Sequence, residues 1–140
     1  MKVFQSKFNK LPGTDYREVY EKAWDLYKNI KRKSKRKPYI RSAYFGNNKV
    51  FLDYFWQHLH QKHQSDRLRR LKFYACALEL LQKTRTLPTI KSHVNKPHNL
   101  LYRFLGKTSE GDLFAVQILQ DLKKEKKHFL SVFPYDLHDE

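Results

Sequence analysis

The hydrophobic pattern of this 140-residue chain changes its period once. As far as about residue 83, apolar side chains recur at the three- and four-residue spacing of amphipathic helices. From residue 100 they form short runs of strand type, separated by turn residues. Helices followed by strands predict one α+β domain, with N-terminal helices packed on a C-terminal antiparallel sheet of three to four strands.

Three helices are expected before the change. The first runs from Asp15 into the low thirties, where Pro38 prevents it from continuing. After an extended segment at 39–45, the second helix covers 49–63. The third begins at Ser65 and fades at Thr84, and residues 86–97 read as a loop.

Three strands are expected after the change, at 100–105, 113–119 and 128–133. If Gly106 pairs with Asp112, then Phe104 opposes Phe114, and these apolar side chains face the helices. Arg103 and Gln117 then share the opposite face. A one-residue shift would reverse this allocation, and that alternative stays open.

The charge of the chain is strongly unbalanced. It carries 29 Lys and Arg against 14 Asp and Glu, a formal net charge of +15, and six of the seven residues at 31–37 are basic. Such an excess repels itself in a folded protein, so it predicts a polyanionic partner, although the basic run alone could be a solvated linker. The expected phosphate contacts are Lys31, Arg32, Lys33, Lys35, Arg36, Lys37, Arg67, Arg70, Lys107 and Lys127.

Other features of the sequence indicate the compartment and bear on membrane and metal binding. The single Cys76 forms no internal disulfide, and residues 1–10 lack the apolar segment of a signal peptide, so we expect a cytoplasmic protein. No apolar run approaches about 18 residues, so no membrane partner is expected. His58 is expected to point inward, with His60 and His63 at the surface. Because these three lack the spacing of a zinc pair, no metal or other cofactor is expected.

Acid–base chemistry on RNA needs cations around a phosphate and a group that moves a proton near neutral pH. The side chains of that kind on or near the predicted sheet are Arg41, His98, Arg103, Gln117, His128 and Ser131. Each also has an ordinary interpretation, since an Arg on a strand often forms a surface ion pair and a Ser near a strand end often bonds to the backbone.

The C-terminal pattern resembles a known superfamily. Leu101–Gly106, a turn with Gly111, Leu113–Ile118 and Lys127–Pro134 together resemble the sheet of phage- and plasmid-associated nucleases of the barnase–EndoU–colicin–RelE-like superfamily. Pro38–Phe45 and the following segment extend the resemblance. It covers 38–134 as a nuclease-like core, with 1–37 as an added helix and basic extension and 135–140 as an acidic tail.

The resemblance implies a small metal-independent ribonuclease in which the 2′-hydroxyl attacks the adjacent phosphate on an open sheet face. By position, Arg103, Gln117 and Ser131 match the sheet-face sites, and His128 and Lys127 are their neighbours. The chain lacks the paired His and Glu of barnase. The implied partners are RNA, whether free, ribosome-bound or transfer RNA, and an acidic antitoxin or inhibitor.

Two kinds of function therefore stay open. In the first, the protein is a toxin-like endoribonuclease: Arg103 and Arg41 hold the phosphate, Ser131 and Gln117 orient it, and His98 or His128 transfers protons. In the second, it is a noncatalytic RNA- or DNA-binding protein. The charge fits both, because phosphate contacts position a protein on nucleic acid whether or not the strand is cut.

Overall fold

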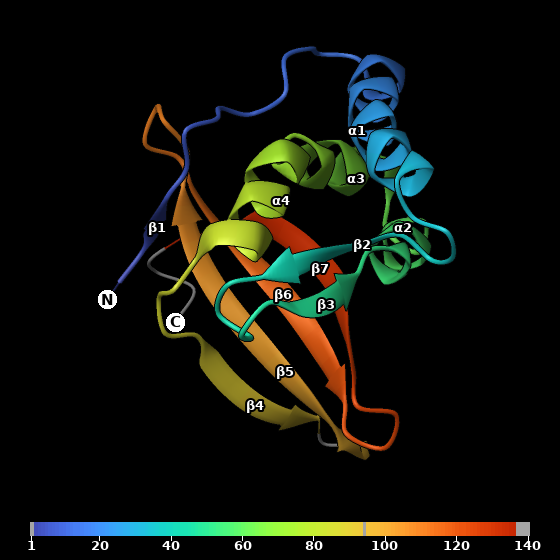
Figure 1. Cartoon of the computed structure of the whole chain (residues 1–140). Helices are drawn as coiled ribbons and strands as arrows, with labels where there is room; N and C mark the ends of the chain where they lie inside the picture. Colours follow the sequence, from blue (N-terminus) through green and yellow to red (C-terminus); the bar gives the residue numbers. More distant parts are fainter. Residues whose placement is uncertain (1, 94, 137–140) are drawn as a thin grey trace.

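The computed structural model describes residues 2–93 and 95–136, which form an α+β fold of four helices and a curled, mixed sheet of seven strands (Figure 1). In chain order the elements are β1 (Phe4–Gln5), α1 (Tyr16–Arg32), β2 (Tyr39–Ser42), β3 (Asn48–Phe51), α2 (Asp53–Leu59), α3 (Gln64–Leu71), α4 (Tyr74–Lys83), β4 (Thr89–His93), β5 (Lys96–Lys107), β6 (Leu113–Asp121) and β7 (Lys126–Pro134).

The sheet has the strand order β1-β5-β6-β7-β3-β2, and β4 also pairs with β5. The pairs β1–β5 and β3–β7 are parallel and the other pairs are antiparallel. The α+β class is as predicted, but the predicted C-terminal antiparallel sheet of three to four strands is wrong. Two strands from the N-terminal half pair in parallel with the edges of the β5–β6–β7 meander, β1 with β5 and β3 with β7, and they make the sheet mixed.

The sheet curls around α4, which lies between β2 and β5 (Figure 1). On the inner face Phe104, Val116 and Phe129 are at most 1% exposed. The β6–β7 pairing shifts register between Gln117 and Ile118, so Phe129 faces inward although Ser131, two residues further on, pairs with Gln117 on the outer face. The Phe55 ring of α2 stacks on Phe129, with centroids 4.8 Å apart. The buried side of α1, which includes Val19, closes the same core.

The second predicted helix is wrong in its first part. Gly46 and Asn47 have φ values of +64° and +66°, so the chain turns back after β2 and forms β3 instead of entering a helix. Only Asp53–Leu59 is helical. The third predicted helix is divided at Lys72 and Phe73 into α3 and α4, and the Phe73 ring packs against Phe114 at this division, with centroids 5.4 Å apart.

The predicted loop at 86–97 contains β4, which pairs with β5. The predicted register of β5 and β6 is two residues off: Gly106 pairs with Phe114, whose ring lies where a Cβ at position 106 would be. A shift of two residues preserves the faces, so the prediction that Arg103 and Gln117 share a face is confirmed. Of the predicted acidic tail, residues 137–140 lie outside the described residues.

Candidate nucleic-acid interface

A polar row crosses the outer face of the sheet, the face turned away from α4. Arg103 on β5 pairs with Gln117 on β6, and Gln117 pairs with Ser131 on β7. The Ser131 Oγ donates a hydrogen bond of 3.1 Å to the Gln117 Oε1. Ser131 is only 3% exposed, so this bond holds its hydroxyl in one place. The register therefore brings three of the predicted site residues together.

Two arginines flank an aromatic ring beside this row. The guanidinium carbons of Arg103 and Arg70 each lie 5.5 Å from the centroid of the Phe133 ring. Arg70 reaches it from α3, where its Nε also lies 2.9 Å from an Asp66 carboxylate oxygen. Burial alone would raise the pKa of Asp66, but hydrogen bonds and charges from Arg69 and Arg70 lower it. Asp66 therefore stays ionised and holds Arg70 beside Phe133.

His128 lies on the same strand as Ser131, and its pairing with Leu119 places it on the same face of the sheet, where it is buried. Its ring stacks on Tyr54 of α2, with centroids 3.8 Å apart and planes 5° apart, and it is 8% exposed. Burial lowers the pKa of His128 and outweighs the opposing charge of Asp121. Its imidazole is therefore neutral near pH 7, and its Nδ1 accepts no hydrogen bond from another described residue.

A basic groove adjoins this surface on the β3 side. It consists of two hollows of about 730 and 770 Å³ that share Lys49, Phe51 and Lys126. The hollows lie between the 33–37 segment, the β2–β3 hairpin and the β6–β7 loop. Among the described residues its only acid is Glu125, and its cations are Lys33, Lys35, Arg36, Lys37, Arg41, Lys49, Lys124, Lys126 and Lys127.

Aromatic rings lie among these cations. Tyr39 and Phe51 are paired residues of β2 and β3, and their ring centroids are 6.1 Å apart. The Lys49 Nζ lies 4.6 Å from the centroid of Tyr39, and the Lys126 Nζ lies 5.7 Å from that of Phe51. Arg41 is 5.6 Å from the Tyr39 centroid. Cations interleaved with aromatic faces are the usual lining of surfaces that bind single-stranded nucleic acid.

The groove cations keep their charge available. None of the ion pairs between described residues involves a cation of the basic groove. The Asp121 carboxylate at its edge accepts hydrogen bonds from the backbone N–H groups of Lys123 and Lys124, at 3.0 and 3.2 Å. That acid therefore shapes the β6–β7 loop, and the groove presents a concentrated positive field to solvent.

The other predicted residues are dispersed. Lys31 and Arg32 end α1. Arg67 donates hydrogen bonds of 2.7 Å to two backbone carbonyls, those of Lys62 and His60, and so braces the α2–α3 turn. Lys107 pairs with Leu113 at the end of the sheet away from the groove. His98 lies five residues along β5 from Arg103, so the structure does not unite it with the polar row.

The structure places two further predicted residues at the basic groove and the three histidines of 58–63 elsewhere. Arg41 belongs to the groove and donates a hydrogen bond of 3.1 Å to the Asn47 carbonyl. The Lys127 Nζ lies 5.0 Å from the centroid of Phe45 at the groove's edge. His60 and His63 are exposed, as predicted, whereas His58 is half-buried. Burial, followed by the charges of Lys62 and Arg70, lowers the pKa of His58.

Sequence reasoning missed Tyr39, Lys49, Phe51 and Lys126 as groove residues. A signal was present, because Gly46-Asn47 between two short β-type runs is a known hairpin pattern. Placing Lys49 and Phe51 on a strand rather than a helix would have put both on one face with Tyr39. Which residues of the β6–β7 loop meet that face depends on the parallel β3–β7 pairing, which no local pattern reveals.

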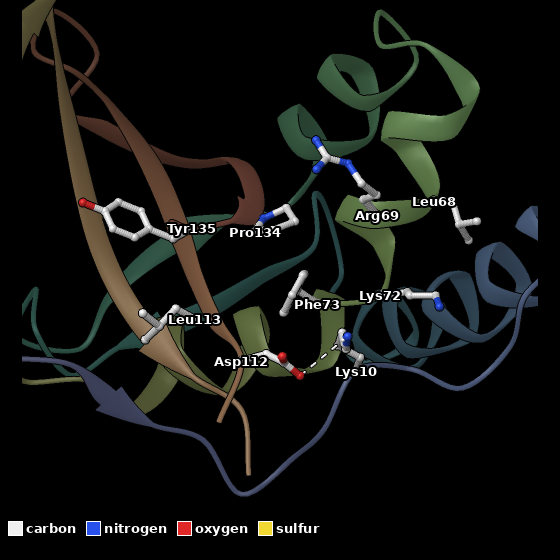
Figure 2. A pocket seen from close by; sticks show the side chains of 9 residues that line it. All are labelled: Lys10, Leu68, Arg69, Lys72, Phe73, Asp112, Leu113, Pro134 and Tyr135. Carbon is white, nitrogen blue, oxygen red and sulfur yellow. Dashed lines mark ion pairs between the residues drawn. The ribbon is translucent and has the colours of Figure 1, made fainter. Parts of the chain in front are cut away.

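A third hollow, of about 410 Å³, lies at the opposite end of β6 and β7 (Figure 2). The Lys10 Nζ and an Asp112 carboxylate oxygen are 3.5 Å apart at one end, Arg69 lies at the other, and Phe73 lies between them. Arg69 is also paired, with Asp66 at 2.9 Å. Since two of its cations already have carboxylate partners and much of its wall is apolar, this hollow is a weaker site for a polyanion than the basic groove.

Comparison of the chain with models of protein families, with curated proteins and with solved structures gives no match. The resemblance to the barnase–EndoU–colicin–RelE-like superfamily therefore stays a prediction. Within residues 2–93 and 95–136, no group of three or more His, Cys, Asp or Glu side chains could hold a metal ion. Over the same residues, no helix has the length and apolar character needed to cross a membrane.

Proposed function

We propose that this protein binds RNA in the basic groove. The observation that carries the proposal is the groove itself. There, cations from three segments, none in an ion pair with a described residue, surround the half-buried rings of Tyr39 and Phe51. Phosphates would meet the cations and bases would meet the rings. A cytoplasmic setting suits this function, since the buried Cys76 needs no oxidising compartment.

Binding is tested by fluorescence anisotropy with a labelled 2′-O-methyl oligoribonucleotide. This strand lacks the free 2′-hydroxyl that would attack the adjacent phosphate, so it stays intact during the measurement. The logarithm of the association constant should fall linearly with the logarithm of salt concentration, with a slope of roughly −0.7 per phosphate contacted. An unmodified DNA strand of the same sequence tests for a preference between the two nucleic acids. If neither strand binds at low salt, the proposal is wrong.

Cleavage of the bound RNA is the second candidate function, favoured by the polar row beside the groove. In this reaction the 2′-oxygen bonds to the adjacent phosphorus and the bond to the 5′-oxygen breaks, leaving a 2′,3′-cyclic phosphate and a 5′-hydroxyl. Arg103 and Arg70 would stabilise the charge on the phosphate, and Ser131 would orient it. The neutral imidazole of His128 would accept the 2′-hydroxyl proton, and water would protonate the 5′-oxygen.

Cleavage is tested with unmodified RNA in the presence of a metal chelator, with and without ribosomes. Wild-type protein should yield cyclic-phosphate ends, and Arg103→Ala should reduce the rate by about 10²- to 10³-fold, the usual cost of losing one such charge-stabilising donor. Arg17→Ala, which removes a cation from α1, is the matched control and should cleave normally. Intact RNA in both arms would leave binding as the function and rule out cleavage of these substrates.

A further inference from the structure

We propose that the basic groove is selective for single strands and stacks one unpaired base on Tyr39 and another on Phe51. This inference rests on the proposed function and goes beyond it, because a site made only of cations would also accept a duplex. Four rings form a row across neighbouring elements: Tyr39 on β2, Phe51 on β3, His128 on β7 and Tyr54 on α2.

The rings of this row differ in what covers them. His128 and Tyr54 lie parallel to each other, so each already covers one face of its neighbour. Tyr39 and Phe51 meet at 68°, and the His128 ring is tilted by 37° from Phe51. No described aromatic ring therefore lies flat on Tyr39 or Phe51. Since both side chains line the hollows, their faces are the ones that a planar ligand can reach.

Cations now occupy positions near these two rings. Lys49 lies 4.6 Å from the Tyr39 centroid and Lys126 lies 5.7 Å from the Phe51 centroid. A contact between an exposed ammonium and a ring is weaker than the stacking of a base on that ring. An arriving base would therefore displace the ammonium, which would remain close enough to pair with the phosphate beside that base. Each ring and its cation together would bind one nucleotide.

A duplex cannot use this arrangement. Its bases are already stacked inside the helix, and it offers phosphates alone to the surface unless bases are unstacked at a cost. The segment at 33–37 could still contact the backbone of a duplex. The rings would then contribute nothing, so the difference in affinity between single strand and duplex measures the stacking on Tyr39 and Phe51.

The experiment compares a 2′-O-methyl single strand of about 12 nucleotides, a length typical of such sites, with the duplex of the same sequence. Wild-type protein should bind the single strand about tenfold more tightly than the duplex. Tyr39→Ala/Phe51→Ala should lose about tenfold or more for the single strand and leave duplex affinity within about twofold. Phe8→Ala is the matched control, because Phe8 is an exposed ring, 51% accessible, that lines neither hollow of the groove.

A second pair of variants separates stacking from damage to the fold. Tyr39→Phe keeps the ring and should retain the preference for the single strand, whereas Tyr39→Leu/Phe51→Leu keeps apolar bulk without either ring and should lose it. If wild-type protein binds both forms equally, or Tyr39→Leu/Phe51→Leu keeps the preference, the inference is overturned while RNA binding stands. If wild-type protein binds neither form, both the proposed RNA binding and this inference are wrong.

Discussion

The outer surface of α1 and the basic groove are both rich in cations, but they differ in whether those cations are paired with acids. On α1, Arg17 pairs with Glu21 at 3.3 Å and Lys22 pairs with Glu18 at 3.1 Å, each one helical turn apart. Lys28 has Asp25 within 3.9 Å. In the groove no cation forms an ion pair with a described residue.

Abundance of Lys and Arg therefore does not by itself identify a binding surface. Paired surface cations are close to neutral in effect, since exposed pairs contribute little and leave little field. Clustered cations without acids repel one another and destabilise the folded state unless a polyanion neutralises them. The groove is therefore where binding energy is available, and the α1 surface provides matched controls on the same molecule.

The largest expected effect comes from removing three cations at once. Lys35→Ala/Arg36→Ala/Lys37→Ala should weaken RNA binding at low salt by about a hundredfold and make the log–log salt dependence shallower by about 2, because three phosphate contacts are lost. Arg17→Ala/Lys22→Ala/Lys28→Ala removes the same charge from α1 and should change affinity by less than about twofold. Equal losses in the two triple variants would contradict this expectation, because binding would then follow net charge alone.

In thermal stability the order of the two triple variants should be reversed, with the larger loss in the α1 variant. The α1 variant loses three helix-surface pairs, each contributing about 0.3–0.5 kcal/mol, and its Tm should fall by about 3 °C. The groove variant loses mutual repulsion, so its Tm without RNA should stay level or rise at low salt. Calorimetry at two salt concentrations checks this. A lower Tm for the groove variant would mean that those cations stabilise the fold.

A smaller effect is expected from the acid of the groove. Glu125 has a φ of +54°, a backbone conformation that Asn adopts at less cost. Glu125→Asn removes the like charge that an RNA phosphate would meet and should strengthen binding by about threefold. Titrations at two salt concentrations measure the change. Glu21→Gln on α1 is the control, and an equal gain there would show that the effect is not local.

The smallest expected effect is on pH dependence. In the folded state the pKa of His128 is lowered from its ordinary value of 6.5. Between the folded and the unfolded pKa of this group, the unfolded chain therefore binds more protons than the folded protein. The contribution of this group to the free energy of unfolding is therefore fully present above pH 6.5 and is lost as the pH falls from there towards the folded pKa. Tm should decline between pH 7.5 and 5.5, and His128→Phe, which keeps a ring against Tyr54, should decline less. The same decline in both proteins would contradict this role.

The shared face of Arg103 and Gln117 was predictable from sequence, whereas the groove as a whole was not, for a physical reason. Strand faces follow from the two-residue period, so Arg103 and Gln117 shared a face even though the register prediction was off by two residues. The β3 strand was missed because Val50, Tyr54, Phe55 and Leu59 also fit a helical spacing. The contact of Arg70 with Phe133 joins α3 to β7 through tertiary packing, which no local pattern encodes.

Photo-crosslinking locates bound RNA on the surface of the protein. A single-stranded RNA carrying 4-thiouridine, with 2′-O-methyl sugars to prevent cleavage, is irradiated with the full chain, and the crosslinked peptides are identified by mass spectrometry. We expect crosslinks at Tyr39 and Phe51, and peptides from 16–32 should remain free. Crosslinks concentrated on α1, or spread evenly over the basic peptides, would contradict binding in the basic groove, because RNA would then follow positive charge in general.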